Sequence, residues 1–483
     1  MQLKHAAASG VRWTALSLLV VSVTQLFRLI VLGNILEPSS FGLLAMMLVA
    51  TGFMELVSRL GLSESIIQHH EPTHIELSSL YWLNIIMGCL MYAIFILLIP
   101  LFAFIFSTPE LIELFPWLGL TLLVVPWGAQ FHAMLQKKLC FKSIAIIEIT
   151  SVVIGATVSI ALAINGFVVW SLVWGVISQC FVLTILFVLV GWNHRMFPGL
   201  HFKYDAIKPY LSFGFHRMGG MLLNYFNVRA DQFVVGVLLG PQALGYYSMA
   251  FNLVLRPISQ INPMLTKIAF PVLTKVRDDK IKLRRGYFKL LDLLSSINSP
   301  LLIGVALVAP VMVPALLGEK WLPTVPLIQI LSLYALLRSM GNAGGSLVLA
   351  SGRADLSLYW NLILFCIIPV AVFFGANING LLGVSWTLLT LQIILVIGWY
   401  RYGVQRLLGR CFRGYIKSIM IPMVLTLPMV VILIAVKSVM PRISVITQLV
   451  IEVLIGAIIY LGFYFWLRKN FMIEQFRLFF NLK

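Results

Sequence analysis

Long apolar segments follow one another along this chain of 483 residues, and they limit the fold more than any other feature of the sequence. About 20 apolar residues in a helix cross the hydrocarbon core of a membrane. Each segment must also satisfy its own backbone hydrogen bonds in lipid, which favours an all-helical bundle. We predict fourteen membrane-spanning helices, at residues 12–34, 41–63, 79–106, 111–135, 143–164, 167–192, 211–239, 243–270, 287–317, 322–349, 356–377, 380–400, 415–438 and 444–467. The predicted fold class is therefore an all-α polytopic membrane protein.

Composition excludes several other classes of protein. With 60% hydrophobic and 11% charged residues, the chain has too little polar surface for a soluble domain of this length. The net charge of +18 does not indicate a nucleic-acid partner, because most lysines and arginines lie in short segments between apolar runs. The five cysteines are scattered without metal-ligand spacing, so neither a disulfide framework nor a metal site is predicted.

The positions of the basic residues predict the orientation in the membrane. Alternate connections between the predicted helices are rich in lysine and arginine, above all residues 275–289 and 401–417. The connections on the other side hold only Lys320, Lys437 and Arg442. Because cytoplasmic loops carry the excess of positive charge, we expect both termini to be cytoplasmic.

A repeated segment predicts that the bundle is duplicated. The two copies are Leu36-Glu37-Pro38-Ser39-Ser40-Phe41-Gly42-Leu43-Leu44-Ala45-Met46 and Leu239-Gly240-Pro241-Gln242-Ala243-Leu244-Gly245-Tyr246-Tyr247-Ser248-Met249. Each copy lies between two apolar runs, as expected for the internal repeats of secondary transporters. We predict a six-helix lobe at residues 1–195, a cytoplasmic linker at 196–210, a second six-helix lobe at 211–400 and a helix pair with a cytoplasmic tail at 401–483.

Polar side chains within the predicted spans indicate where a substrate passes, because ionisable groups are costly at membrane depth. Asn252, Arg256, Gln260, Pro263 and Lys267 are spaced by three or four residues and form one polar stripe on a helix. In lipid such a stripe must face protein or water, so we expect Arg256 to face the lumen. Lys267 lies near a cytoplasmic helix end, where snorkelling is an equally good explanation.

The first helix of each lobe carries further polar groups. Thr24 and Arg28 lie in a weaker stripe of the first span, and the corresponding seventh span carries Asn224 and Arg229. If the lobes are related by pseudo-symmetry, these two helices occupy equivalent places and line opposite walls of one cavity.

Other charged residues in the spans have competing explanations. Arg59 lies four residues after Glu55, which favours an ion pair on one helix face over contact with a ligand. Arg229 and Asp231 are too close in sequence to face each other on one helix, although either could pair with a neighbouring helix. Arg338 is followed by glycines that serve either a site at depth or close helix packing.

The sequence shows no catalytic signature. It has no glycine-rich phosphate loop, no nucleophile elbow and no large soluble loop that could carry a catalytic domain. His69, His70 and His74 resemble a metal cluster, but their spacing is more typical of a solvated polar loop. We therefore expect a transporter rather than an enzyme, with no cofactor.

Several motifs resemble those of a known family. They are the first copy of the repeat, its continuation Leu60-Gly61-Leu62-Ser63-Glu64-Ser65-Ile66-Ile67-Gln68, then Phe141-Lys142, Leu211-Ser212-Phe213-Gly214, the second copy of the repeat and Gly318-Glu319-Lys320-Trp321. In order and spacing they resemble the polysaccharide exporters of the multidrug/oligosaccharidyl-lipid/polysaccharide superfamily, in particular the Wzx-type branch that includes colanic acid exporters. The resemblance covers about residues 8–400 and no single motif is specific by itself.

The resemblance implies both an architecture and a function. It implies two pseudo-symmetric lobes in a V-like arrangement around a central cavity, in the bacterial inner membrane. It also implies that a polyprenyl-diphosphate-linked oligosaccharide moves from the cytoplasmic to the periplasmic leaflet by alternating access. Cations in that cavity are typical of the family, and Arg28, Arg229, Arg256 and Arg338 are the matching positions. Beside membrane lipids, the expected partners are a polysaccharide polymerase or export machinery and a coupling ion, H⁺ or Na⁺, unless the substrate's own downhill supply drives the transport.

Three alternatives remain open from the sequence. A multidrug extruder of the same fold would need acids facing the lumen, for which Glu55 and Asp231 are available. A lipid II flippase of the same superfamily is poorly separated by sequence. A membrane glycosyltransferase or polymerase would need a large extracytoplasmic loop, and the predicted connections on that side are short.

Overall fold

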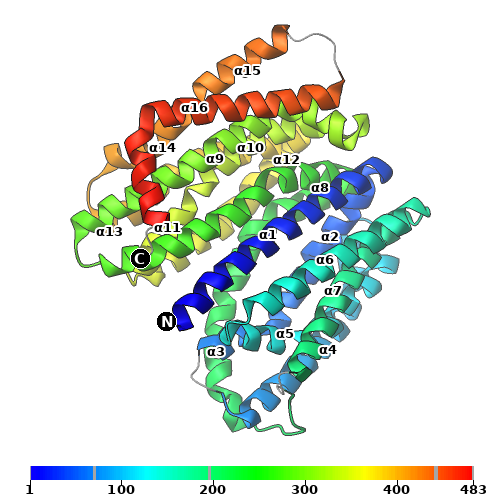
Figure 1. Cartoon of the computed structure of the whole chain (residues 1–483). Helices are drawn as coiled ribbons and strands as arrows, with labels where there is room; N and C mark the ends of the chain where they lie inside the picture. The colour runs from blue at the N-terminus through cyan, green and yellow to red at the C-terminus, as the bar shows by residue number, and fades with distance from the viewer. Residues whose placement is uncertain (1, 69–71, 194–196, 440–443, 481–483) are drawn as a thin grey trace. The chain divides into compact units, whose positions relative to one another are not determined.

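In the computed structural model the chain is helical along its length, which confirms the predicted fold class (Figure 1). The structure describes residues 2–68, 72–193, 197–439 and 444–480, and these ranges contain no β-strand. The elements are α1 (Gln2–Ile35), α2 (Pro38–Arg59), α3 (Leu62–Gln68), α4 (His74–Ile105), α5 (Leu111–Lys137), α6 (Phe141–Ile164), α7 (Val168–Asn193), α8 (Tyr204–Lys275), α9 (Lys280–Leu317), η1 (Glu319–Trp321), α10 (Thr324–Ser339), α11 (Gly341–Ala350), α12 (Ala354–Trp399), η2 (Tyr400–Val404), α13 (Gln405–Leu408), α14 (Phe412–Val424), α15 (Leu427–Val439) and α16 (Val445–Phe480).

Two of the long helices are each two membrane spans joined without a loop. The described residues contain 12 helical stretches that are long and apolar enough to cross a membrane. Helix α8 breaks at Gly240, where φ is 78°, and α12 breaks at Asn379 and Gly380, where φ of the glycine is 51°. Each break falls at a predicted turn, so all fourteen predicted spans are found.

The chain divides into two compact units, which we call unit 1 and unit 2. Unit 1 comprises Met1–Ser248 and Leu364–Pro369, and unit 2 comprises Met249–Ile363 and Val370–Lys483. Unit 1 extends past the predicted linker at residues 196–210, and the first half of α8 contacts α2: the Tyr225 hydroxyl donates to the Val49 carbonyl at 2.7 Å.

Unit 1 is built around pairs of neighbouring helices. Helix α6 packs on both α1 and α7, while α5 packs on α4 and α7 (Figure 1). The turn between α6 and α7 contains Gly166 at φ 85°, so these two helices are the antiparallel neighbours that the short Asn165-Gly166 connection predicts.

The described part of the predicted linker is held against the first turns of α4. The Ser78 hydroxyl accepts a hydrogen bond from the Gly199 N–H at 2.8 Å, and the Ser79 hydroxyl accepts one from the Lys203 N–H at 2.9 Å. The Trp82 indole N–H donates to the Gly199 carbonyl at 3.0 Å. This segment is therefore fixed to α4 by hydrogen bonds between α4 side chains and its own backbone.

Unit 2 is centred on α9. Helices α10, α14 and α16 all pack on α9, and α15 packs on α16 (Figure 1). One of its apolar clusters joins Met429 and Leu433 of α15 to Tyr460 and Tyr464 of α16.

Candidate functional site

The polar stripe of α8 lies opposite the face by which this helix packs in unit 2. Val254, Ile258 and Leu265 are buried, and Asn262 is fully buried against α9, where Asn298 Nδ2 donates to Asn262 Oδ1 at 2.9 Å. Arg256 is six residues before Asn262, which corresponds to a rotation of about 240° around an α-helix. The stripe therefore points away from the core of its own unit.

Arg256 is the residue of this stripe that is best placed to bind a ligand. Its side chain is half-buried near the middle of a membrane span, and its guanidinium makes no hydrogen bond or ion pair with the described residues. Asn252 and Gln260 on the same face are also half-buried, while Lys267 is exposed. A half-buried guanidinium with its donors available can bind an anion.

The polar stripe of α1 faces the neighbouring helices of unit 1. Ser17 is buried and its hydroxyl donates to Glu148 Oε2 of α6 at 2.7 Å. Arg28 is half-buried, and its Nη2 would lie 2.9 Å from a Cβ added to Gly175 of α7. Thr24 lies between them in the stripe and is half-buried. Arg28 is thus placed beside α7, where the absence of a side chain at Gly175 leaves room for it.

Arg229 and Asp231 belong to a polar cluster within unit 1. The buried Asp231 carboxylate accepts hydrogen bonds from the Tyr247 hydroxyl at 2.7 Å and from the Gln232 N–H at 2.8 Å. Arg229 Nη1 donates to Gln232 Oε1 at 2.6 Å. Asn224, two turns earlier in α8, is exposed. The bond from Tyr247 joins the two halves of α8 across the break at Gly240.

The ion pair predicted between Glu55 and Arg59 is present. Arg59 Nη2 lies 2.5 Å from Glu55 Oε1, with 53% and 34% of the two side chains exposed. Pairs this exposed typically contribute only about 0–1 kcal/mol to stability. The pair therefore contributes little to the stability of the fold, and its main effect is to neutralise the charge of Glu55.

Arg338 lies in the last turn of α10 and contacts a tyrosine of its own helix. Its Nη1 donates to the Tyr334 hydroxyl at 2.8 Å, and its guanidinium carbon lies 5.7 Å from the centre of the Tyr334 ring. Of the glycines that follow, Gly344 packs so closely on Trp399 that an added Cβ would lie 2.3 Å from the indole nitrogen, while Gly341 has open space. The segment that follows Arg338 thus contains one closely packed glycine, Gly344, and one glycine with open space beside it, Gly341.

Unit 2 contains an apolar cavity that the sequence did not predict. It measures about 730 Å³ and is lined by apolar side chains and glycines of α9, α15 and α16, among them Gly304, Met429 and Gly456. Its acidic lining residue is Glu452, which is fully buried. Lys437 Nζ lies 3.4 Å from Glu452 Oε2 and forms an ion pair with it.

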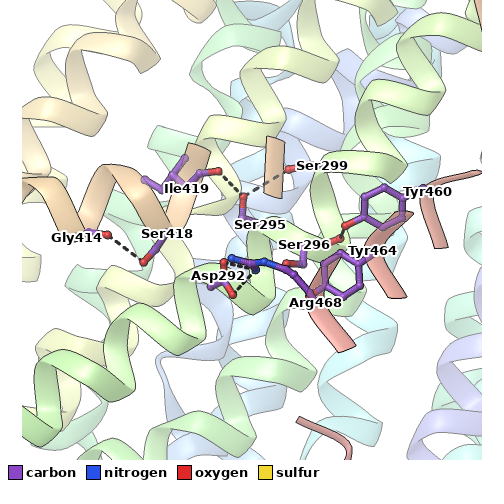
Figure 2. Close-up of polar contacts among 10 residues, drawn as sticks. All are labelled: Asp292, Ser295, Ser296, Ser299, Gly414, Ser418, Ile419, Tyr460, Tyr464 and Arg468. Atoms are coloured by element: carbon purple, nitrogen blue, oxygen red, sulfur yellow. Dashed lines mark hydrogen bonds and ion pairs between the residues drawn. The ribbon is translucent and has the colours of Figure 1, made fainter. Parts of the chain in front are cut away.

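A buried polar cluster connects α9 with α14 and α16 close to this cavity (Figure 2). Arg468 Nη1 donates to both oxygens of Asp292, at 2.8 and 2.7 Å. The Tyr460 hydroxyl donates to the Ser296 carbonyl at 2.6 Å, and the Tyr464 hydroxyl donates to Ser296 Oγ at 3.2 Å. Asp292 and Arg468 lie on different helices far apart in the sequence, so no local pattern predicts this pair.

The structure offers no metal site among the residues it describes. No group of three or more histidine, cysteine, aspartate or glutamate side chains there could hold a metal ion. His69 and His70 lie outside the described residues, and the ring nitrogen Nε2 of His74 is 3.1 Å from the Phe197 carbonyl oxygen.

Comparisons with known proteins place the chain in a family. Residues 31–326 match the model of a family described as polysaccharide biosynthesis protein. The chain is 35% identical over 434 residues to the lipopolysaccharide biosynthesis protein WzxC of Escherichia coli K12, covering 89% of this chain and 88% of that protein. It is 32% identical over 459 residues to the teichuronic acid biosynthesis protein TuaB of Bacillus subtilis, covering 94% of both chains.

A solved structure shows the same fold at low sequence identity. The lipid II flippase MurJ, in an inward closed conformation, superposes with a TM-score of 0.73 and 15% identity, covering 96% of this chain and all of that one. The family match and the two relatives agree over most of the chain. The chain therefore belongs to the polysaccharide biosynthesis protein family.

Proposed function

We propose that this protein is a flippase that moves a polyprenyl-diphosphate-linked oligosaccharide from the cytoplasmic to the periplasmic leaflet by alternating access. The observation that carries the proposal is the stripe of α8, in which Arg256 lies in mid-span, faces away from the core of its unit and has no partner among the described residues. The names of relatives that act in lipopolysaccharide and teichuronic acid biosynthesis support it.

The chemistry of a diphosphate fits such a residue. A diphosphate that leaves water needs counter-charge and hydrogen-bond donors, and the planar guanidinium of arginine supplies both in a fork. Asn252 and Gln260 would add neutral donors on the same helix face. We rank Arg28, Arg229 and Arg338 below Arg256 because each lies close to a neighbour of its own unit.

The apolar cavity of unit 2 supports a substrate with a hydrocarbon chain. Its lining of α9, α15 and α16 is almost entirely apolar, and it lies among membrane spans. A polyprenyl chain is of the right chemical class for such a cavity, whereas a small hydrophilic substrate is not.

The acids within the spans give little support to a cationic drug as substrate. Glu55 is paired with Arg59, and Asp231 accepts hydrogen bonds from Tyr247. We propose further that the protein lies in the cytoplasmic membrane with both termini in the cytoplasm, that a gradient of H⁺ or Na⁺ drives it, and that it delivers its cargo to a polysaccharide polymerase or export machinery.

The test replaces Arg256 in cells and measures lipid-linked oligosaccharides by mass spectrometry. We expect Arg256→Ala to accumulate one polyprenyl-diphosphate oligosaccharide to the level of a deletion strain, and Arg256→Lys to restore export in part because it keeps the charge but loses the fork. Arg277→Ala, which removes an exposed cation outside the spans, is the matched control.

The amount of protein in the membrane is measured by immunoblot for every variant. If Arg256→Ala exports normally at a normal amount of protein, the stripe of α8 is not the substrate path. Unchanged lipids in the deletion strain, together with raised sensitivity to cationic drugs, would favour an extruder.

A further inference from the structure

Two basic segments of unit 2, residues 275–289 and 401–417, lie side by side although they are far apart in the sequence. Arg284 of α9 joins them, because its Nη2 donates to the Leu408 carbonyl at the end of α13. A Cβ added to Gly409 would lie 3.5 Å from the same nitrogen. The start of α9 therefore lies beside the turn between α13 and α14.

From this turn, α9 and α14 continue next to each other in the same direction. A Cβ added to Gly414 would lie 2.4 Å from the Phe288 ring. Further along both helices, the Ser295 hydroxyl donates to the Ile419 carbonyl at 2.9 Å (Figure 2). Because both helices begin at this end, their basic first turns lie on one side of the membrane, which is the cytoplasmic side in the proposed orientation.

Three basic residues at the start of α14 have their charge available. Arg410, Arg413 and Lys417, which we call the α14 cations, are exposed and form no hydrogen bond or ion pair with any residue that the structure describes. The segment 401–417 also contains no aspartate or glutamate. The N–H groups of the first turn of α14 are not capped by the Cys411 side chain, which adds to the positive potential there. The start of α14 is thus a concentration of positive charge without an acid of its own.

The acids of the neighbouring basic segment are engaged elsewhere. Asp279 accepts hydrogen bonds from two N–H groups of α9, and its carboxylate lies 3.2 Å from Lys282 Nζ. Asp278 Oδ1 lies 3.7 Å from Arg277 Nε. The charge of the α14 cations is therefore best balanced by an anion from outside the chain.

The exposed face of α14 changes from cationic to apolar along the helix. Four exposed residues share this face, at spacings of four, three and four: Arg413, Lys417, Met420 and Val424. Met420 and Val424 lie deeper in the membrane span than the two cations. This order of charged and apolar groups matches a phospholipid, whose acyl chains extend from a charged headgroup into the bilayer.

We propose that the start of α14 is a binding site for an anionic phospholipid of the cytoplasmic leaflet. The lipid phosphate contacts the α14 cations, and an acyl chain lies along Met420 and Val424. Guanidinium groups bind phosphate oxygens through paired N–H donors, and clustered cations at a cytoplasmic helix end attract anionic headgroups. A zwitterionic phospholipid fits less well, because its ammonium group finds no acid in the segment 401–417. This site belongs to the helix pair beyond the duplicated lobes, and the lipid bound there is a component of the surrounding membrane rather than cargo.

Native mass spectrometry of the full-length protein in detergent measures this binding. The protein is titrated separately with dioleoyl phosphatidylglycerol, dioleoyl phosphatidylcholine and undecaprenyl diphosphate. We expect phosphatidylglycerol to bind at least about tenfold more tightly than phosphatidylcholine. The difference should shrink as the salt concentration is raised, because exposed charges are screened. Glycerol 1-phosphate, which has the phosphate but no acyl chain, should not displace the bound lipid at equal concentration.

A triple variant removes the proposed site. Arg410→Gln, Arg413→Gln and Lys417→Gln together should weaken the binding of phosphatidylglycerol about tenfold and leave that of phosphatidylcholine unchanged. Arg410→Lys with Arg413→Lys should keep most of the affinity, because the charges remain. The melting temperature in detergent should stay close to that of the parent in all these variants, since the replaced side chains are exposed and have no partner among the described residues.

A second triple variant is the matched control, because it removes the same charge from exposed lysines of unit 1. It combines Lys138→Gln, Lys203→Gln and Lys208→Gln, which lie in connections predicted to be on the same side of the membrane. This variant should bind phosphatidylglycerol with an affinity close to that of the parent. A similar loss of affinity in both triple variants would show a general effect of net charge and would overturn the proposal.

The remaining outcomes distinguish other sources of phosphate. Unchanged binding of phosphatidylglycerol in the first triple variant overturns the site, and displacement of the lipid by glycerol 1-phosphate would indicate a site for a soluble anion instead. If that variant loses affinity for undecaprenyl diphosphate but not for phosphatidylglycerol, the α14 cations serve the cargo and the proposal is wrong. Because binding is measured without transport, failure of this site leaves the proposed flippase untouched, and normal lipid-linked oligosaccharides in the deletion strain would overturn the function alone.

Discussion

At the scale of single residues, the pair of Asp292 and Arg468 is the interaction whose loss should be most damaging. Their side chains are only 9% and 18% exposed, and Arg468 Nη1 contacts both carboxylate oxygens. Removing one partner of a buried pair leaves the other charge uncompensated, which typically costs about 3–5 kcal/mol. We therefore expect Asp292→Asn to lower the melting temperature in detergent clearly.

An exposed pair provides the control for this prediction. Arg353 Nη2 and Asp355 Oδ2 are 2.8 Å apart, but 54% and 46% of the two side chains are exposed. Asp355→Asn should leave the melting temperature in detergent nearly unchanged, because the charges of an exposed pair stay solvated when they part. An equal loss of stability in both variants would contradict the view that burial makes the first pair important.

These ion pairs also show which contacts can be predicted from the sequence and which cannot. Glu55 and Arg59 are four apart on one helix, so their pairing follows from helical geometry and was predicted. Asp292 and Arg468 are 176 residues apart, and only the packing of α16 on α9 brings them together. The polar stripe of α1 was predicted as a stripe, but its neighbours α6 and α7 were known only once the helices were packed.

At the scale of elements, the start of α9 should depend on pH. The Asp279 side chain accepts hydrogen bonds from the N–H groups of Lys282 and Ile281, both at 3.0 Å, and these bonds lower the pKa of Asp279. A lowered pKa in the folded state means that the stabilisation is present above the unfolded pKa of about 3.9 and is lost as pH falls below it.

Hydrogen exchange at the first turn of α9 measures this effect. The exchange of its amides, corrected for intrinsic rates, should lose protection as pH falls below about 4. Asp279→Asn should keep protection nearly independent of pH, because an amide still caps the helix, and Asp279→Ala should lose it at all pH values. Identical pH profiles for Asp279→Asn and the parent would refute a role for this carboxylate.

The same helix shows why hydropathy locates spans better than their ends. The apolar run predicts a span from residue 287, whereas α9 begins at Lys280. The preceding turn of basic residues is helical because Asp279 caps it, which an apolar count does not detect. The predicted turns at Gly240 and Asn379-Gly380 were correct because a change of direction requires backbone angles that glycine adopts easily.

At the scale of the whole molecule, the orientation can be tested with reporter fusions. Alkaline phosphatase is active only outside the cytoplasm, so a fusion ending at Arg277 should be inactive and one ending at Asn379 should be active. The physical reason is the concentration of basic residues in the segment that contains Arg277. The reverse pattern of activities would require the opposite orientation, with both termini outside the cytoplasm.

The repeat allowed the sequence to predict a duplicated bundle, but not how its copies meet. The contact of Gly42 with Pro241, and of Gly245 with Pro38, joins the two copies of the repeat, and their similarity in sequence does not reveal that they touch. The cavity lined by α9, α15 and α16 was beyond prediction for a related reason. Its apolar lining residues look like any lipid-facing or core residues until three helices are placed around them.

The segment fixed to α4 by Ser78 and Ser79 bears on how the chain is made. During synthesis, α4 enters the membrane before residues 199–203 leave the ribosome. Those residues can dock as soon as they emerge, while the rest of α8 is still unmade. With docking in this order, the six preceding spans fix where the seventh span begins and in which direction it crosses the membrane before that span is inserted.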